Sequence, residues 1–147
     1  MNIELVPALE IDIDFAFEVK RQAMGEHIKS KWGWDEAFQR SVHEQRYIEK
    51  PWFIVYYNGE PIGTVSVHHL ENYVRFGEFY LMTKYRNKGI GSYILKNFLS
   101  ECDKNTRVVV LEYLKWNPVG ALYKRNGFEV TSESDIHYFM ERKPKSH

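Results

Sequence analysis

The sequence predicts one α/β domain in which antiparallel strands precede a central strand and a helical crossover follows it. The chain has 147 residues, 44% hydrophobic and 27% charged, which suits a single globular domain spanning residues 1–147. A hairpin signal, Asn58-Gly59, separates two strand-like runs in the first half of the chain. At Gly89 the spacing of apolar residues changes from that of a strand to that of a helix. Together these observations predict the α/β class.

Charge, cysteine content and hydropathy exclude several classes of protein. Twenty basic residues balance twenty acidic ones, so the sum does not favour wholesale binding to nucleic acid or to an anionic membrane. The one cysteine, Cys102, allows neither an intrachain disulfide nor a cysteine-based zinc site, and the six histidines lack metal-ligand spacing, so we expect no metal. No apolar stretch approaches the roughly 20 residues that span a bilayer, and residues 1–10 do not resemble a signal peptide. We therefore expect a cytoplasmic protein.

The N-terminal third is predicted to form a short strand and two helices. Residues 3–6 are an apolar run that Pro7 closes. Asp12 or Asp14 can cap the first helix, and Asp35 can cap the second. The expected apolar positions are Phe15, Val19 and Ala23 in the first helix and Phe38 and Val42 in the second.

Strands and helices are predicted to alternate in the rest of the chain. Strands are expected at residues 52–57, 62–70 and 73–82, and the last of these is apolar on both faces, as is typical of a central strand. Helical spacing then runs from Gly89 to Cys102. Another strand is expected at residues 107–114. Asn117-Pro118 is typical of a helix start and Gly127 of a helix end. The strands that close the sheet are expected at residues 128–131 and 136–141.

The segment from Arg86 to Gly91, between the central strand and the helix, indicates a phosphate site. Two glycines let the backbone approach a ligand closely, and the helix start directs free N–H groups at the same spot. A dinucleotide fingerprint does not fit, because its third glycine position is Ile94. A nucleoside triphosphate loop does not fit either, because Lys88 is followed by Gly89. The alternative is a tight strand-to-helix turn with solvated charges.

Two motifs resemble those of the GNAT (GCN5-related N-acetyltransferase) family. The loop resembles the motif (Arg/Gln)-x-x-Gly-x-(Gly/Ala) through Arg86, Gly89 and Gly91. The last helix resembles the signature of that family's later helix, through Asn117, Ala121, Leu122, Tyr123 and Gly127-Phe128. The resemblance covers residues 51–140. Thr83 stands where a proline is common and Asn87 where a glycine is common, and Asn117 is shifted by one position from the commonest spacing.

The resemblance implies a GNAT-like fold: a mixed, mostly antiparallel central sheet of about six to seven strands flanked by about four helices. In that family acetyl-CoA, the expected cosubstrate, lies where the central strand and the next strand splay apart, here the strand ending at Met82 and the strand at 107–114. Backbone groups of Leu81 and Thr83, left unpaired by the sheet, would bind the pantetheine arm. The cofactor-binding residues implied are Leu81, Met82, Thr83, Arg86, Asn87, Lys88, Gly89, Ile90, Gly91, Ser92, Asn117, Ala121 and Tyr123.

The resemblance also implies catalytic roles for Tyr123 and Glu78. Tyr123 matches the position that commonly protonates the CoA sulfur, and a phenol with a pKa of about 10 is a ready donor at neutral pH. Glu78 interrupts an apolar strand face shared with Phe76 and Tyr80, so we expect a raised pKa and a role as general base. The alternatives are a core tyrosine and a structural carboxylate. Asn117, before Pro118, can equally be a plain helix cap.

The acceptor site is expected in the first two helices. Trp32, Trp34 and Asp35, with His68 on a neighbouring strand, could bind a cationic amine through ring faces and a carboxylate. The tryptophans could instead pack a helix corner, and His68 could be structural.

The expected function is acetyl transfer from acetyl-CoA to a primary amine of a small molecule, by direct attack in a ternary complex, in a monomer or homodimer. The alternatives are a protein lysine or N-terminal acetyltransferase, which would act on a peptide acceptor, and a non-catalytic acyl-CoA-binding module.

Overall fold

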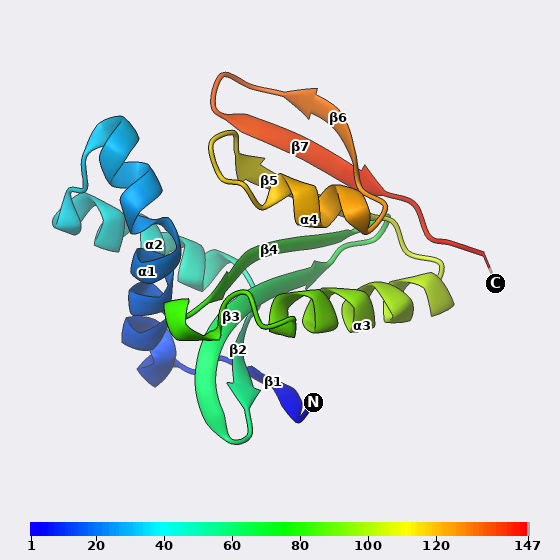
Figure 1. Ribbon diagram of the computed structural model, residues 1–147, viewed down its shortest axis with the longest axis horizontal. Helices are drawn as coiled ribbons and strands as arrows, with labels where there is room; N and C mark the ends of the chain where they lie inside the picture. Colours follow the sequence, from blue (N-terminus) through cyan, green and yellow to red (C-terminus); the bar gives the residue numbers. More distant parts are fainter. Residues whose placement is uncertain (147) are drawn as a thin grey trace. The chain divides into compact units, whose positions relative to one another are not determined.

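The computed structural model describes residues 1–146, which contain four α-helices and seven strands (Figure 1). The helices are α1 (Ile13–Trp32), α2 (Glu36–Glu49), α3 (Ile90–Lys104) and α4 (Gly120–Arg125). The strands are β1 (Ile3–Pro7), β2 (Trp52–Tyr57), β3 (Glu60–His69), β4 (Val74–Leu81), β5 (Val109–Leu114), β6 (Glu129–Glu133) and β7 (His137–Arg142). Short 3-10 turns lie at Glu10–Asp12 and Thr83–Tyr85.

The chain divides into two compact units, and the first consists of residues 1–67 and 78–88. Here β1 pairs antiparallel with β2, and β2 with β3. Asn58 and Gly59 both have positive φ, 51° and 82°, which confirms the predicted tight hairpin. On β3, a Cβ added to Gly63 would lie 2.3 Å from the Tyr80 carbonyl oxygen of β4, so only glycine fits where these strands meet.

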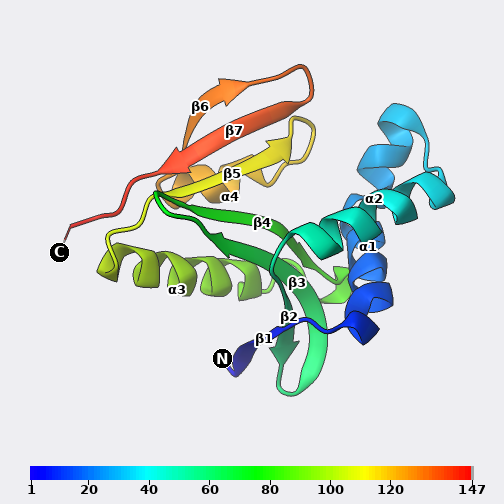
Figure 2. The same ribbon diagram turned by 180° about the vertical axis from the view of Figure 1, so that it is seen from behind.

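The second unit consists of residues 68–77 and the chain from residue 89 onward. Strand β7 pairs antiparallel with both β5 and β6, as the views in Figures 1 and 2 show. Strand β4 pairs parallel with β5, and the register consists of Val74↔Val109 and Arg75↔Val110 among the described residues. Because β4 contributes to both units, the strand order reads β1-β2-β3-β4-β5-β7-β6. The predicted mixed, mostly antiparallel sheet is confirmed.

Several positions depart from the predictions for the helices. In α1, Val19 is buried as expected, but the rest of the buried face is Ala16, Phe17, Lys20, Met24 and Ile28, while Phe15 and Ala23 are only half-buried. In α2, Phe38 is 62% exposed and His43 is the buried residue. Helix α4 begins at Gly120 rather than at Pro118, the first helical residue that the sequence predicts after an Asn117 cap. Sequence spacing missed Lys20 and His43 because neither residue is counted as apolar.

The predicted single domain, residues 1–147, stays a prediction, and its last residue lies outside the described part. None of the helices in residues 1–146 is both long enough and apolar enough to cross a bilayer.

Candidate functional site

The loop from Arg86 to Gly91 has the backbone conformation of an anion-binding turn. Asn87 and Gly89 are in the left-handed region, with φ of 59° and 81°, and residues 87–89 are exposed. Asparagine is among the side chains that tolerate this region best, so Asn87 can stand where the motif that the loop resembles commonly has glycine. Helix α3 begins at Ile90, so its first amides have no partner within the helix. This arrangement fits a phosphate.

Arg86 does not extend from this loop into solvent. Its Nε donates a hydrogen bond to the Leu81 carbonyl oxygen at 3.1 Å, and burial lowers the pKa of its guanidinium. Its Nη2 atom is buried and has no hydrogen-bond partner within residues 1–146. A half-buried cation with a buried, unused donor fits an anionic ligand, while the Nε contact holds the loop against the end of β4.

The backbone at the end of β4 is less open than predicted. The Thr83 amide donates to Gln22 Oε1 of α1 at 2.9 Å, and the Met82 amide donates to the Ile62 carbonyl of β3 at 2.8 Å. The Leu81 carbonyl accepts from Arg86. Side chains, not sheet partners, thus bind the Leu81 carbonyl and the Thr83 amide, so both atoms already have hydrogen bonds that a pantetheine arm would have to replace.

Glu78 lies in a cluster of charges rather than on an apolar face. Its φ of 45° breaks the regular strand conformation, and the Thr64 hydroxyl donates to its carbonyl oxygen at 2.9 Å. We call Glu78, Lys20 of α1, Arg46 of α2 and the following Lys50 the Glu78 cluster. Arg46 Nη1 and Lys50 Nζ lie 3.7 Å and 3.6 Å from Glu78 Oε1. A positive φ at a residue other than glycine is strained, and such strain gathers at functional sites.

The raised pKa predicted for Glu78 is wrong. Burial acts to raise the pKa of this carboxyl, but the positive charges of Lys20, Arg46 and Lys50 outweigh burial and hold the pKa below its usual value. A hydrogen bond with Tyr80 adds a smaller effect in the same direction. Glu78 is therefore a carboxylate at neutral pH, and its Oε2 atom is buried with no partner among the described residues.

Lys20 is the site residue that sequence reasoning missed most clearly. It is 3% exposed, and burial lowers the pKa of its ammonium, while Glu78 acts in the opposite direction. The signal was present in the sequence: Lys20 lies one helical turn from both Ala16 and Met24, on the buried face of α1. A lysine in such a stripe indicates a buried cation that requires a negative partner.

Tyr123 of α4 lies in an aromatic cluster within the second unit. It is 6% exposed, and its ring centroid lies 6.5 Å from Phe76, 6.0 Å from Tyr113 and 5.6 Å from Phe128. Burial, with a smaller effect from Tyr113, raises the pKa of its phenol above the ordinary value. The hydroxyl therefore stays protonated at neutral pH, as a proton donor must.

The other two predicted residues near α4 have different surroundings. Asn117 precedes the helix, and its Oδ1 accepts from the Val119 amide at 3.1 Å, so it caps the turn that leads into α4. Ala121 is exposed.

The predicted acceptor residues lie largely at the corner between α1 and α2. Trp32 is 54% exposed. Trp34 donates from Nε1 to Glu36 Oε2 at 2.6 Å, and Asp35 accepts from the Phe38 amide at 3.0 Å as the N-cap of α2. His68 is half-buried and belongs to the second unit. Trp34 and Asp35 thus already have partners within the helix corner.

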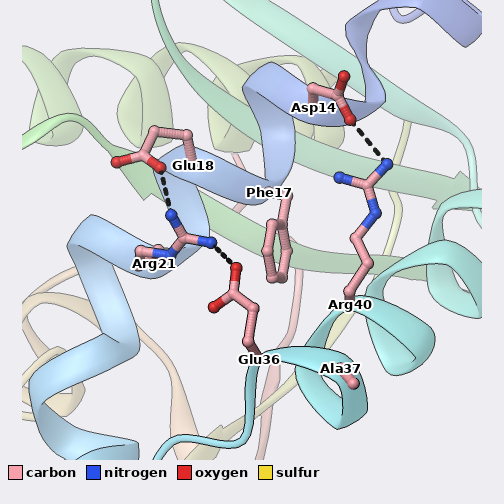
Figure 3. Close-up of a pocket in the computed structure, with 7 residues that line it drawn as sticks. All are labelled: Asp14, Phe17, Glu18, Arg21, Glu36, Ala37 and Arg40. Carbon is pink, nitrogen blue, oxygen red and sulfur yellow. Dashed lines mark hydrogen bonds and ion pairs between the residues drawn. The ribbon is translucent and has the colours of Figure 1, made fainter.

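A surface pocket between α1 and α2 is lined by Asp14, Phe17, Glu18, Arg21, Glu36, Ala37 and Arg40 (Figure 3). In Figure 3 the Phe17 ring lies between the guanidinium groups of Arg21 and Arg40, at 5.0 Å and 5.4 Å from its centroid. Arg21 pairs with Glu18 and Glu36, and Arg40 with Asp14 and Glu44. Both arginines of this pocket are therefore already paired with acidic side chains of α1 and α2. Among residues 1–146, His, Cys, Asp and Glu form no group that could hold a metal ion.

A family model, described as an acetyltransferase (GNAT) domain, matches residues 49–130. No curated protein matches the sequence. A PaiA N-acetyltransferase from Thermoplasma acidophilum, solved in complex with coenzyme A, is similar in structure, with a TM-score of 0.76 and 20% identity over 97% of this chain and 99% of that chain. The ribosomal-protein-S18-alanine N-acetyltransferase from Escherichia coli has a TM-score of 0.70 and 15% identity, over 99% and 96% of the two chains. The yncA protein from Salmonella typhimurium, solved with its cofactor acetyl-CoA, has a TM-score of 0.62 and 18% identity, over 100% and 96%.

Proposed function

The chain belongs to the GNAT family of acetyltransferases, and we propose that it transfers an acetyl group from acetyl-CoA to a primary amine of a small molecule. The conformation of the loop at residues 86–91 carries this proposal, because two left-handed residues and a helix start direct backbone amides at one spot. Two of the similar proteins were solved with coenzyme A or acetyl-CoA, which supports the same cosubstrate here.

The loop would hold the pyrophosphate through the amides of residues 87–92. Lys88 adds positive charge at an exposed position, and the half-buried Arg86 adds a second cation at the base of the loop. Asn117, Ala121 and the backbone of residues 81–83 are further proposed contacts to the pantetheine arm. Contact with the Thr83 amide would require Gln22 to release it.

Bound acetyl-CoA supplies an acyl carbon activated as a thioester. The acceptor ammonium loses a proton, its nitrogen forms a bond to the acyl carbon, and the carbon–sulfur bond breaks. The Tyr123 hydroxyl would protonate the departing sulfur, because its raised pKa keeps it protonated until that moment. Tyr123 would recover a proton from the nitrogen of the product, and one proton would be released to solvent in each turnover.

Glu78 would act on the acceptor amine as an ionised group. Its lowered pKa makes it a weak base but a constant negative charge at neutral pH. It would therefore bind the ammonium and orient the water that removes the proton, whereas the sequence predicts a general base with a raised pKa.

Substitutions at two glycines with nearly the same conformation test whether the loop at residues 86–91 binds the phosphates of acetyl-CoA. Gly89 has φ 81° and Gly59, in the β2–β3 hairpin, has φ 82°, and an added Cβ would meet nothing within 4 Å at either. Gly89→Glu should abolish the increase in Tm that acetyl-CoA causes, because the carboxylate would fill the phosphate position. Gly59→Glu carries the same backbone strain and should keep the increase. An equal increase in both variants would refute the loop assignment.

The reaction itself is tested by thiol release from acetyl-CoA with amines, polyamines, aminoglycosides and peptides. Turnover with small amines supports the proposal. Turnover with peptides alone would identify a protein acetyltransferase, and binding without turnover would identify an acyl-CoA-binding module.

A further inference from the structure

The Glu78 cluster contains more positive charge than it needs to stabilise one carboxylate. Lys20, Arg46 and Lys50 surround a single negative group. Lys20 and Glu78 are buried, whereas the side chains of Arg46 and Lys50 are 43% and 28% exposed. The buried carboxylate thus lies beneath two cations that solvent can reach. The pocket of Figure 3 is different, because its arginines pair with the acids beside them.

The contacts within the cluster leave hydrogen-bonding groups unused. Arg46 and Lys50 both approach Glu78 Oε1, at distances longer than a hydrogen bond. Glu78 Oε2 is buried and accepts no hydrogen bond from the described residues. An unsatisfied buried carboxylate oxygen is costly, and a donor from a ligand would remove that cost. Because neither cation is hydrogen-bonded to Oε1, both keep N–H donors that a ligand could accept.

We propose that the acceptor is an amine that also carries a carboxylate close to its nitrogen, as a free α-amino acid does. Its ammonium would donate to Glu78 Oε2, and its carboxylate would bind Arg46 and Lys50. The compact cluster suits two opposite charges attached to the same carbon of one ligand. This inference rests on the proposed function and narrows it. A peptide N-terminus or a protein lysine has no free carboxylate beside its amine, so this chemistry excludes both.

The test compares ligands that differ in the carboxylate alone. Leucine, leucinamide and 3-methylbutylamine form one series, and phenylalanine, its amide and phenethylamine form another. Dissociation constants are measured by calorimetry on the full chain saturated with coenzyme A, and kcat/KM by thiol release. We expect the amino acid to bind roughly 10- to 100-fold more tightly than either neutral analogue, as for hydrogen bonds between charged groups.

Variants of Arg46 on α2 and of Lys50 just after it assign this preference to the cluster. Arg46→Gln should bring the ratio of amino acid to amide affinity close to one, and Lys50→Gln should reduce it. Arg40→Gln is the matched control on the same helix, with a side chain that is 32% exposed and bound to acids instead. It should preserve the ratio.

The outcomes separate this inference from the proposed function. Equal affinity across a series, or no binding of any member, overturns the inference even if acetyl-CoA still raises Tm. Failure of acetyl-CoA to raise Tm overturns the proposed function, whereas the preference for carboxylates can still be measured by calorimetry on the free protein. An unchanged ratio in both Arg46→Gln and Lys50→Gln would show that the preference arises elsewhere and would also overturn the inference.

Discussion

Glu78 and Tyr123 are both buried, yet their surroundings move their acid–base properties in different ways. At Tyr123, aromatic rings exclude water, and burial raises the pKa of the phenol. At Glu78, burial acts in the same direction, but three cations reverse it and lower the pKa of the carboxyl. Burial therefore does not decide a protonation state by itself. The charges that other elements bring to the group decide whether it is a proton donor or a fixed anion.

The largest expected effect is at Tyr123. Tyr123→Phe keeps the ring in the aromatic cluster and removes the donor, so kcat should fall about 10- to 1000-fold, with little change in the Tm increase caused by acetyl-CoA. Tyr113→Phe is the control, since Tyr113 lies in the same cluster at 6.0 Å. If Tyr113→Phe loses the activity and Tyr123→Phe keeps it, the donor is Tyr113.

Glu78→Gln should have the next largest effect, because it leaves three cations without their negative partner. The free energy of unfolding should fall by about 3 kcal/mol, as when one member of a buried ion pair is removed, measured by urea denaturation. Glu112→Gln breaks an ion pair of the same length, 3.7 Å to Arg75, whose side chains are about 40% exposed. That variant should lose less than about 1 kcal/mol. Equal losses would contradict the buried cluster.

The same substitution tests the role of Glu78 in the reaction. Since the pKa of Glu78 lies below its usual value, the carboxylate is already ionised where activity rises with pH. Glu78→Gln should lower kcat and leave the rising limb of the pH profile in place, because the amine sets that limb. Displacement of the limb toward alkaline pH would instead identify Glu78 as the base.

Lys20→Met should produce a smaller effect that isolates the cause of the low pKa. Loss of this cation should raise the pKa of Glu78, followed by NMR titration of its carboxyl carbon. Stability should fall by less than in Glu78→Gln, because Glu78 keeps Arg46 and Lys50 as positive partners. Lys29→Met, at an exposed position of α1, should leave the titration unchanged. A Glu78 titration that is the same in both variants would refute the account given for its pKa.

The smallest expected effect is a pH dependence of stability at His43. Its Nε2 lies 3.0 Å from the Ile13 carbonyl, its Nδ1 is buried without a partner among the described residues, and burial lowers the pKa of its ring. The unfolded chain binds a proton near pH 6.5 and the folded one only at lower pH. The stability linked to His43 is therefore complete above pH 6.5 and falls as the pH drops toward the folded pKa. Urea denaturation of His43→Phe should lack this part of the pH dependence, while His69→Gln, at an exposed site, should retain it.

Local chemistry was enough to predict most of the backbone. Strand β2 begins and ends where predicted, because an apolar β-forming run is bounded by Pro51 and by a dipeptide suited to positive φ. Asp35 caps α2 as expected, since its side chain reaches an amide three residues away. The glycines of the loop at residues 86–91 could also be interpreted from sequence, because a left-handed residue just before a helix start depends on local backbone conformation alone.

The properties of the site depended on residues that only tertiary structure brings together. Lys20, Arg46 and Glu78 come from α1, α2 and β4, and no pattern within one element states that their charges meet. The same holds for Gln22, whose side chain accepts the hydrogen bond of the Thr83 amide. It also holds for His43, which is buried although Phe38 was the expected core residue of α2. Electrostatic interactions act through space in a medium of low dielectric constant, so they follow distance and not sequence separation. The sequence by itself determined the strands, the helices, the hairpin and the loop, whereas the folded arrangement decided that Glu78 is an ionised carboxylate among cations.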